Sequence, residues 1–448
     1  MLFFLEYVLH YVQRTNVFEI RPLDDDGEEI LRTLLDASAA LWNEVTYDRR
    51  QLFFDGDNVW NATGHLDRYK HVIGYANAQQ VLRKNKFAWE SFFKFLEDPS
   101  FEASPPGYWG NEEEGRDLHT VIRHDQYTLQ WGERSRLEIP VGQQLKDEYG
   151  LGYHERLRLE VVGEPRWDGD PGQLKIQYDG VTDTYRAHQP VTIDETELDS
   201  PLASEEAALD IGANNLVACT TTTGTQYLYR GRQLFERFLG TSNEIAAYEA
   251  EADGQTPTNR ILRLYRRRSE RRNHAQDALV RDLLGRLYDE GVSRLYVGDL
   301  KGVLKSHWSA TVNLKTHEFW AFRRFINRLD MVSSEYGIQL IETSEAWTTQ
   351  ECPNCGERDD TTRKGDTFTC ESCGFKGHAD LKASRLFLER ETGSVGSMAR
   401  PVRLDWDCHQ WQPTSSAVEV GHVTSAEDRT NRSTHDVGNI ALGETEVT

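Results

Sequence analysis

The most restrictive feature of this sequence is a pair of CxxC motifs that stands directly before a predicted helix. The motifs read CPNCG and CESCG, and 14 residues lie between Cys355 and Cys370. Each motif brings two thiolates to one ion from a tight turn, and two such turns close a tetrahedral zinc site. We therefore predict a structural zinc ion held by Cys352, Cys355, Cys370 and Cys373. Because all four ligands come from the protein, any catalysis must use other residues.

Two aspartates occupy positions at which carboxylates often serve catalysis. Asp210 ends the apolar run of ALDIGANN, and Asp380 begins the helix ADLKASRLFLER just after the second CxxC motif. Each acid also has an ordinary interpretation, Asp210 as a turn residue and Asp380 as a partner of the helix dipole. Together they favour an RNase H-like fold, in which a first strand ends in Asp and continues into an antiparallel hairpin. Such sites gather at least three carboxylates around two Mg²⁺ ions.

The hydrophobic pattern divides the chain into an N-terminal half and a later α/β region. A strand at 17–23 precedes helical patterns, and 119–190 alternates as a β-rich module, either a small barrel or a sandwich. After about residue 393 the chain is acidic and rich in Ser, Thr and Gly, which is typical of disorder. We expect these segments: 1–200, an N-terminal strand, a helical segment and the β-module; 204–347, the first α/β segment; 348–376, a zinc ribbon; 377–392, the second α/β segment; 393–448, a disordered acidic tail.

The charge of the chain does not exclude a nucleic-acid partner. The net charge is −22, but the basic residues comprise 39 Arg and only 12 Lys. An acidic, Lys-poor and Arg-rich surface is typical of a halophile with a high-salt cytoplasm, and Arg still grips phosphate there. The N-terminal stretch MLFFLEYVLHYVQR is interrupted by charged residues and lacks a basic leader. It predicts neither a signal peptide nor a membrane span, so we expect a soluble, cytoplasmic protein.

An arginine cluster provides the clearest electrostatic signal for nucleic acid. The stretch NRILRLYRRRSERR at 259–272 contains seven arginines and one glutamate. Several of them share one face of a helix, which would suit a phosphate backbone. A solvated helix face is the alternative interpretation. The residues predicted to bind nucleic acid are Arg260, Arg263, Arg267, Arg268 and Arg271. Charged and aromatic residues at 69–89 either stack on bases or pack a core, and the sequence does not separate the two.

With these motifs in hand, the sequence resembles the TnpB-type transposon-encoded nucleases, which are relatives of the type V CRISPR effectors and of the Fanzor proteins. The resemblance rests on LDIGANNLVA, GDLKG and AWTTQECPNCG-x13-CESCGFKGHADLKAS, and it is strong over 205–390. It implies an α/β, RNase H-like (RuvC-type) nuclease domain with an inserted zinc ribbon. It also implies Asp210 and Asp380 as catalytic acids, catalytic Mg²⁺, a guide RNA and a target DNA.

Two positions depart from the family pattern. Lys382 stands where the family motif Asp-x-Asn-Ala-Ala has its Asn, and Gly298 stands where a strand residue should be the second catalytic Glu. Asp299 is adjacent to Gly298, but a one-residue step along a strand turns a side chain to the opposite face. Glu345 ends the next predicted strand, just before the ribbon, and we predict it as the relocated catalytic acid. A solvated loop acid is the alternative interpretation, and Glu342 would face the other side.

Three functions follow from these observations. The leading one is an RNA-guided, Mg²⁺-dependent DNA endonuclease of an insertion sequence. The loss of the usual glutamate at Gly298 motivates the alternative, an RNA-guided DNA-binding protein that does not cut. The third is a zinc-ribbon interaction module without nucleic-acid chemistry, and the arginine cluster argues against it. Whether another acid replaces the missing glutamate as a metal ligand distinguishes the endonuclease from the non-cleaving binder.

Overall fold

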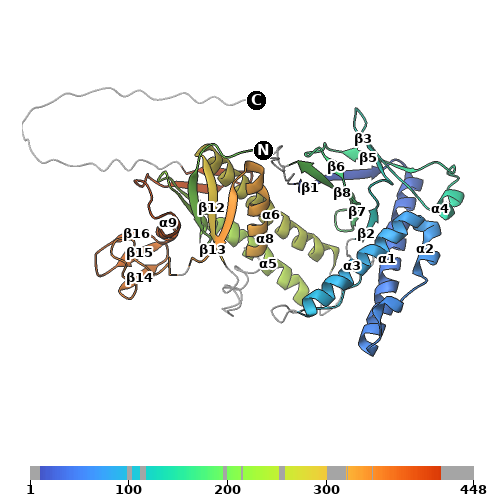
Figure 1. Cartoon of the computed structure of the whole chain (residues 1–448), viewed down its shortest axis with the longest axis horizontal. Helices are drawn as coiled ribbons and strands as arrows, with labels where there is room; N and C mark the ends of the chain where they lie inside the picture. Colours follow the sequence, from blue (N-terminus) through green and yellow to red (C-terminus); the bar gives the residue numbers. More distant parts are fainter. Residues whose placement is uncertain are drawn as a thin grey trace, which may run out of the picture. The chain divides into compact units, whose positions relative to one another are not determined.

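The computed structural model describes residues 11–97, 103–110, 118–194, 199–212, 215–251, 258–299, 319, 321–345 and 347–414. The C-terminal residues from 415 lie outside this set, and so do residues 98–102 and 111–117. Within residues 1–413 the chain forms an N-terminal β-module with helices, a second mixed sheet with helices on both faces, and a small ribbon (Figure 1).

The N-terminal β-module is one antiparallel sheet with the strand order β2-β7-β8-β1-β5-β4-β3. Its elements are β1 (Tyr11–Pro22), β2 (Leu118–Ile122), β3 (Thr128–Gln130), β4 (Arg136–Ile139), α4 (Gln143–Glu148), β5 (Leu157–Val162), β6 (Asp170–Pro171), β7 (Leu174–Asp179) and β8 (Thr184–Asp194). The sandwich expected as one alternative would need two sheets and is therefore wrong. Strand β1 starts earlier than predicted because it pairs with β8 from Tyr11 onward.

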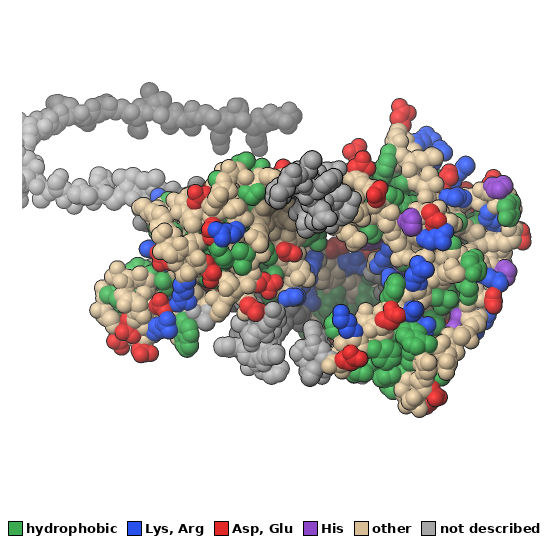
Figure 2. All heavy atoms as spheres, in the orientation of Figure 1, with side chains coloured by type: hydrophobic (Ala, Val, Ile, Leu, Met, Phe, Trp, Pro, Cys, Tyr) green, Lys and Arg blue, Asp and Glu red, His purple; other side chains and the backbone are tan. Residues whose placement is uncertain are grey.

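Three helices accompany this sheet: α1 (Asp25–Asp55), α2 (His65–Ile73) and α3 (Tyr75–Leu96), with the short turn η1 (Val59–Asn61) between α1 and α2. Asp24 caps the N-terminus of helix α1, and its carboxylate accepts a hydrogen bond from the Gly27 amide. Gly56, with a φ of 80°, caps the C-terminus. Its apolar face packs on the sheet through Leu31 and Leu35. Trp89 is fully buried, so core packing explains this aromatic residue. Phe87 of α3 is exposed, and apolar side chains gather on the surface over α1 and α3 (Figure 2).

The second sheet has the strand order β13-β12-β9-β10-β11-β17-β18. Its strands are β9 (Glu205–Asp210), β10 (Asn215–Thr221), β11 (Gln226–Arg230), β12 (Val292–Gly298), β13 (Gln339–Thr343), β17 (Val402–Trp406) and β18 (Trp411–Pro413). Strands β9, β10 and β11 form an antiparallel meander, and β12 and β13 run parallel to β9. Consequently β9, β12 and β13 all end at the same edge of the sheet.

Helices cover both faces of this sheet: α5 (Arg232–Glu251), α6 (Asn259–Asp289), α8 (Phe322–Ser333) with η5 (Ser334–Tyr336), and α9 (Ala379–Thr392). Along β9 the side chains alternate, so Ala207 and Leu209 pack in the core with α6 and α8. Ala208 faces the other way, where it packs with Phe387 and Leu388 of α9. Figure 1 shows α9 and the α6–α8 pair on opposite sides of the strands.

The ribbon lies between β13 and α9 in the sequence and contains β14 (Thr361–Lys364), β15 (Thr367–Cys370) and β16 (Lys376–His378). These three strands form their own antiparallel sheet. Helix α9 starts at Ala379, the residue after β16 ends, so the ribbon and the helix that carries Asp380 share one continuous stretch of chain.

The expectation of disorder from residue 393 is wrong for residues 402–413. Strand β17 pairs in parallel with β11, and β18 pairs with β17. Leu404 is fully buried, and Trp411 is 4% exposed with its indole N–H donating to the Ala275 carbonyl at 3.0 Å. Val402, Leu404 and Trp406 alternate as in a strand, but the acidic, Ser-, Thr- and Gly-rich composition around them led to the expectation of disorder. Strands β17 and β18 complete one edge of the second sheet, and only the tertiary structure shows this pairing.

Contacts also connect the β-module to the helices of the second sheet. The Arg266 guanidinium on α6 pairs with the buried Asp179 carboxylate of β7 at 2.6 Å. Arg166 pairs with Glu335 of η5 at 2.5 Å. One arginine of the cluster at 259–272 is therefore used to join distant segments of the chain. None of the helices in the described part combines the length and the apolar character needed to span a lipid bilayer.

We expect Trp411→Ala to destabilise the domain by about 3–5 kcal/mol, because it removes a buried aromatic side chain and leaves a cavity. Its neighbour Gln412 is exposed, so Gln412→Ala should change the free energy of unfolding by less than about 0.5 kcal/mol. Urea unfolding of both variants measures the difference. Equal stabilities would mean that β18 does not belong to the folded core.

Candidate active site and metal centre

The edge where β9, β12 and β13 end collects the carboxylates that the sequence singled out. Asp210 is the last residue of β9, and Glu345 lies two residues beyond the end of β13. Asp380 is the second residue of α9, which packs across β9 and β10. Asp210 and Asp380 are 7% and 2% exposed, so both carboxylates are almost fully withdrawn from bulk water.

The charges of Asp380 and Glu345 both act on Asp210. The pKa of Asp210 lies well above its usual value, first because the group is buried and then because Asp380 and Glu345 repel its charge. Burial also raises the pKa of Glu345 to about 7. Mutual repulsion among buried carboxylates is the condition that a bound divalent cation relieves, and carboxylate oxygens are the ligands that Mg²⁺ prefers. The donor set therefore fits Mg²⁺.

Another side chain, that of Glu345, occupies the space beside Gly298 where the family has a glutamate side chain. A Cβ atom added to Gly298 would lie 2.2 Å from the Cδ atom and 2.3 Å from the Oε2 atom of Glu345. The Glu345 carboxyl group thus occupies the space that a side chain at position 298 would need. Asp299 is exposed, and its amide donates to the Thr343 carbonyl at 2.9 Å. Glu342 is also exposed.

A tight turn holds the backbone of Glu345. The amide and the hydroxyl of Thr348 both donate to the Glu345 carbonyl, at 3.2 and 2.9 Å. Thr348 is 1% exposed, so these bonds are shielded from water. Trp347, between them, has a φ of 70°, which is uncommon for a residue with a side chain. The turn that follows β13 therefore directs the Glu345 side chain toward the neighbouring strand end.

Two further residues contact the Asp380 carboxylate, and sequence reasoning missed both. The Asn215 side-chain amide donates to Asp380 Oδ2 at 2.8 Å, and Arg363 of β14 donates to Oδ1 at 2.7 Å. Asn215 belongs to the GANN turn after Asp210, which was a possible signal. Arg363 lies in the ribbon hairpin, and only the folding of the ribbon against α9 brings it to the site.

Lys382, the departure from the family motif, does not point at the carboxylates. Its ammonium group donates to the carbonyls of Thr348, Thr349 and Glu351 at 2.8, 2.9 and 3.0 Å. It also lies 3.9 Å from the centre of the Phe368 ring. Burial lowers its pKa to about 8. Lys382 thus fastens the turn after Glu345 to the helix that carries Asp380.

The four predicted cysteine ligands come together in the ribbon. Their sulfur atoms lie within 4.8 Å of one another. Cys352 and Cys373 sulfurs are 3.5 Å apart, and those of Cys355 and Cys370 are 3.6 Å apart. Gly356 and Gly374 follow the second cysteine of each motif with φ of 74° and 75°, as the tight turns require. The quartet therefore could hold a metal ion. Among the described residues, the three carboxylates do not form so tight a cluster.

The five predicted nucleic-acid residues divide into two groups on α6. Arg263, Arg267 and Arg271 are exposed and make no hydrogen bond or ion pair with any residue that the structure describes. The other two have internal partners. Arg260 donates to the Tyr248 hydroxyl and lies over its ring, and Arg268 donates to Ser242 at 2.8 Å.

Comparison with known proteins adds the family. Residues 188–304 match the model of a probable transposase family, and residues 322–387 match the Cas12f1-like TNB domain. The TnpB-like protein ORF457 of Acidianus two-tailed virus is 28% identical over 422 residues, covering 86% of this chain and 88% of that protein. A putative transposase of Methanocaldococcus jannaschii is 30% identical over 79 residues, covering 16% of this chain and 72% of that protein.

The fold also has a solved counterpart. The Cas12f1 chain in the cryo-EM structure of the Cas12f1–sgRNA–target DNA complex aligns with a TM-score of 0.50 and 12% identity, covering 81% of this chain and 82% of that one. Fold, carboxylate edge and ribbon together define a transposase-associated protein of insertion sequences. More narrowly, the chain belongs to the TnpB-type proteins, which are related to the type V effectors.

Replacing Lys382 by Met should loosen the turn after Glu345, because three backbone carbonyls lose a charged donor. We expect a loss of about 1–3 kcal/mol in stability and faster hydrogen–deuterium exchange over residues 347–352. Lys376, an exposed lysine of the same ribbon, provides the matched control as Lys376→Met. Unchanged exchange in the Lys382→Met protein would show that other contacts hold the turn.

Proposed function

We propose that this chain is an RNA-guided, Mg²⁺-dependent DNA endonuclease of an insertion sequence, with Asp210, Glu345 and Asp380 as its catalytic acids. The observation that carries the proposal is the position of the Glu345 carboxyl group, which fills the space of the missing side chain at Gly298. The guide RNA and the target DNA are inferred from the family, since the Cas12f1 relative was solved with an sgRNA and target DNA. We expect the protein to act in the cytoplasm.

The roles of the residues follow from their contacts. When bound, Mg²⁺ ions would activate water and stabilise the leaving oxygen of the phosphodiester. Asp210, Glu345 and Asp380 would hold the ions, and their mutual repulsion in a buried site gives them a strong preference for cations. Asn215 orients Asp380 through its hydrogen bond. Arg363 neutralises Asp380 before ions bind and, once released, is close enough to face a phosphate.

We expect Glu345→Ala to lower the cleavage rate at least about a hundredfold, equivalent to ~2.7 kcal/mol of transition-state stabilisation, and Asp210→Ala to do the same. Asp299→Ala, which alters an exposed acid beside the site, should retain activity. The assay uses protein purified with its co-expressed RNA on plasmids that carry a guide match beside a randomised flank. If all acids prove dispensable while guided binding persists, the non-cleaving RNA-guided binder becomes the better account.

Gly298→Ala offers a sharper test because it removes no functional group. The added methyl group would overlap the Glu345 carboxyl, so the carboxylate must leave its present position. We expect at least a tenfold loss of cleavage, about 1.4 kcal/mol. The double variant Gly298→Glu with Glu345→Ala returns a carboxylate to the usual strand position and should recover some of the rate. Full activity in Gly298→Ala would contradict the role of Glu345.

For the ribbon we propose a structural zinc ion. The protein should contain one zinc per chain, and Cys370→Ala should lose it and unfold the ribbon, because metal binding and local folding are coupled. Metal analysis by mass spectrometry and hydrogen exchange over 352–376 measure both effects. Cys219 is buried outside the ribbon, so Cys219→Ala should keep its zinc. Purified protein without zinc but with a folded ribbon would contradict this assignment.

Nucleic-acid binding should depend on the three unpaired arginines of α6. We expect the Arg263, Arg267 and Arg271 triple charge reversal to Glu to strip bound nucleic acid while the fold is kept. The slope of log affinity against log salt should fall by about 0.7–0.9 for each phosphate that the protein no longer neutralises. The same reversal at Arg134, Arg136 and Arg186, which are exposed on the β-module, is the control. Equal retention in both triple variants would make the α6 arginines a solvated face.

A further inference from the structure

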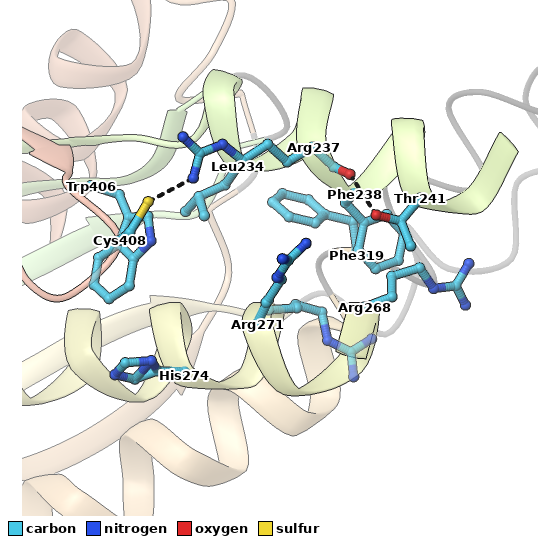
Figure 3. A pocket seen from close by; sticks show the side chains of 11 residues that line it. Leu234, Arg237, Phe238, Thr241, Arg268, Arg271, His274, Phe319, Trp406 and Cys408 are labelled. Carbon is cyan, nitrogen blue, oxygen red and sulfur yellow. Dashed lines mark hydrogen bonds between the residues drawn. The ribbon is translucent and has the colours of Figure 1, made fainter. Parts of the chain in front are cut away.

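A cavity between α5, α6 and the β17–β18 connection is not used by the carboxylate site. Its volume is about 360 Å³. We call it the α5–α6 pocket and define it by Arg237 and Phe238 of α5, Arg271 of α6, Phe319, Trp406 and Cys408. Figure 3 shows Arg237 and Phe238 on one wall, Arg271 on the facing helix, and Trp406 and Cys408 at one end. One wall thus comes from the C-terminal strands that the sequence did not predict.

The polar side of the pocket is strongly cationic. Four of its described lining residues are arginines, and none of the described ones is acidic, although the whole chain has a net charge of −22. Arg271 points into the space between the two helices (Figure 3) and makes no hydrogen bond or ion pair within the described residues. Arg237 donates to the Cys408 sulfur at 2.6 Å. A neutral thiol is a weak acceptor, so this hydrogen bond does not neutralise the guanidinium.

The mutual repulsion of the arginines near the pocket indicates what kind of ligand the pocket would bind. The pKa of Arg271 is lowered, first by partial burial and then by the charges of Arg267 and Arg237. Cations that repel one another without a compensating acid favour an anionic ligand. Two guanidinium groups from facing helices suit a phosphate group, because each can donate more than one hydrogen bond to its oxygens.

The apolar side of the pocket is aromatic. Phe238 and Phe319 are 5% and 3% exposed, and their ring centres lie 5.3 Å apart in an edge-on arrangement. Trp406 is partly buried, and the His274 ring contacts it edge-on with the ring centres 5.4 Å apart. Aromatic side chains beside a guanidinium such as that of Arg271 form the combination on which proteins stack single nucleic-acid bases.

The volume of the pocket and its position beside the arginines of α6 limit the kinds of ligand that it could bind. The cavity falls in the lower part of the roughly 300–1,000 Å³ range of small-ligand pockets, so it suits one nucleotide and excludes a duplex. Arg263 and Arg267 precede Arg271 along α6 at intervals of four residues, a rise of about 6 Å each. All three are exposed. This row leads to the pocket, which favours a nucleotide that belongs to a bound strand over a free one.

We propose that the α5–α6 pocket receives one unpaired nucleotide of the nucleic-acid strand bound along α6, with its phosphate on Arg271 and Arg237 and its base against Trp406 and Phe238. This inference rests on the proposed function, because it assumes that nucleic acid follows α6. Its chemistry is separate from cleavage, since none of the residues that define the pocket belongs to the carboxylate edge.

The first experiment uses AMP as a single-nucleotide probe on the full chain freed of nucleic acid, with adenosine and inorganic phosphate as comparators. We expect AMP to bind more tightly than either fragment. Arg271→Ala should weaken it about tenfold or more, since a charged hydrogen bond to phosphate is lost. Arg136→Ala removes the same charge from the β-module, where the side chain is exposed and does not line the pocket, and should leave AMP binding unchanged. Equal AMP affinity in both variants, or no AMP binding, would overturn the proposal.

The second experiment separates base from phosphate and strand from free nucleotide. A ten-residue oligothymidylate is compared with an abasic oligonucleotide of equal length, which keeps every phosphate. The wild-type chain should prefer the first by about tenfold, the effect of one stacked base. Trp406→Leu, with folding checked by thermal melting, should lose this preference, and Arg136→Ala on the β-module should keep it. AMP that displaces the oligonucleotide at equimolar concentration would show that the pocket serves free nucleotides and would overturn the strand assignment.

Failures of the two proposals remain distinguishable. If the chain binds neither oligonucleotide, the proposed nucleic-acid function fails as well. If it binds both oligonucleotides equally and still cleaves guided targets, only the nucleotide pocket is contradicted.

Discussion

Repulsion among three carboxylates at one sheet edge is the constraint on which the rest of this structure depends. Asp210 and Asp380 are both nearly inaccessible to water, and Glu345 adds a third negative group. Burying like charges costs free energy unless partners compensate them. Asn215 and Arg363 supply compensation to Asp380. The ribbon therefore has a role beyond its cysteines, because its hairpin delivers the arginine that stabilises the site without ions.

In the proposed catalytic site, the Glu345 carboxyl group occupies the space that a side chain at position 298 would need. Parallel pairing places Gly298 beside Thr343, the last residue of β13. Glu345 follows two residues later and therefore lies near the C-terminal end of β12. A glycine at 298 leaves room, and Glu345 fills it. The turn that Thr348 closes and the contacts of Lys382 fix the backbone from which Glu345 extends. The unusual lysine in the α9 motif and the unusual glycine in β12 thus belong to one arrangement.

The arginines of α6 illustrate why local charge alone does not identify a binding surface. Arg266 joins the helix to the β-module, and Arg260 and Arg268 contact neighbouring side chains. Only Arg263, Arg267 and Arg271 remain without partners among the described residues. The same helix therefore combines arginines that hold the fold together with arginines available to a ligand. The α5–α6 pocket lies at the end of the available row.

The sequence by itself determined the cysteine quartet, the strand that ends at Asp210 and the helix that starts with Asp380, because each depends on spacing or periodicity within a short stretch. It also favoured Glu345 over Asp299 through strand alternation. Only the tertiary structure decided that β17 and β18 complete the sheet, that Arg363 and Asn215 reach Asp380, and that Arg271 faces a pocket while Arg268 does not remain free. These features bring together residues that are far apart in the chain. A local sequence pattern cannot predict such contacts, because they depend on how separate elements pack in the folded protein.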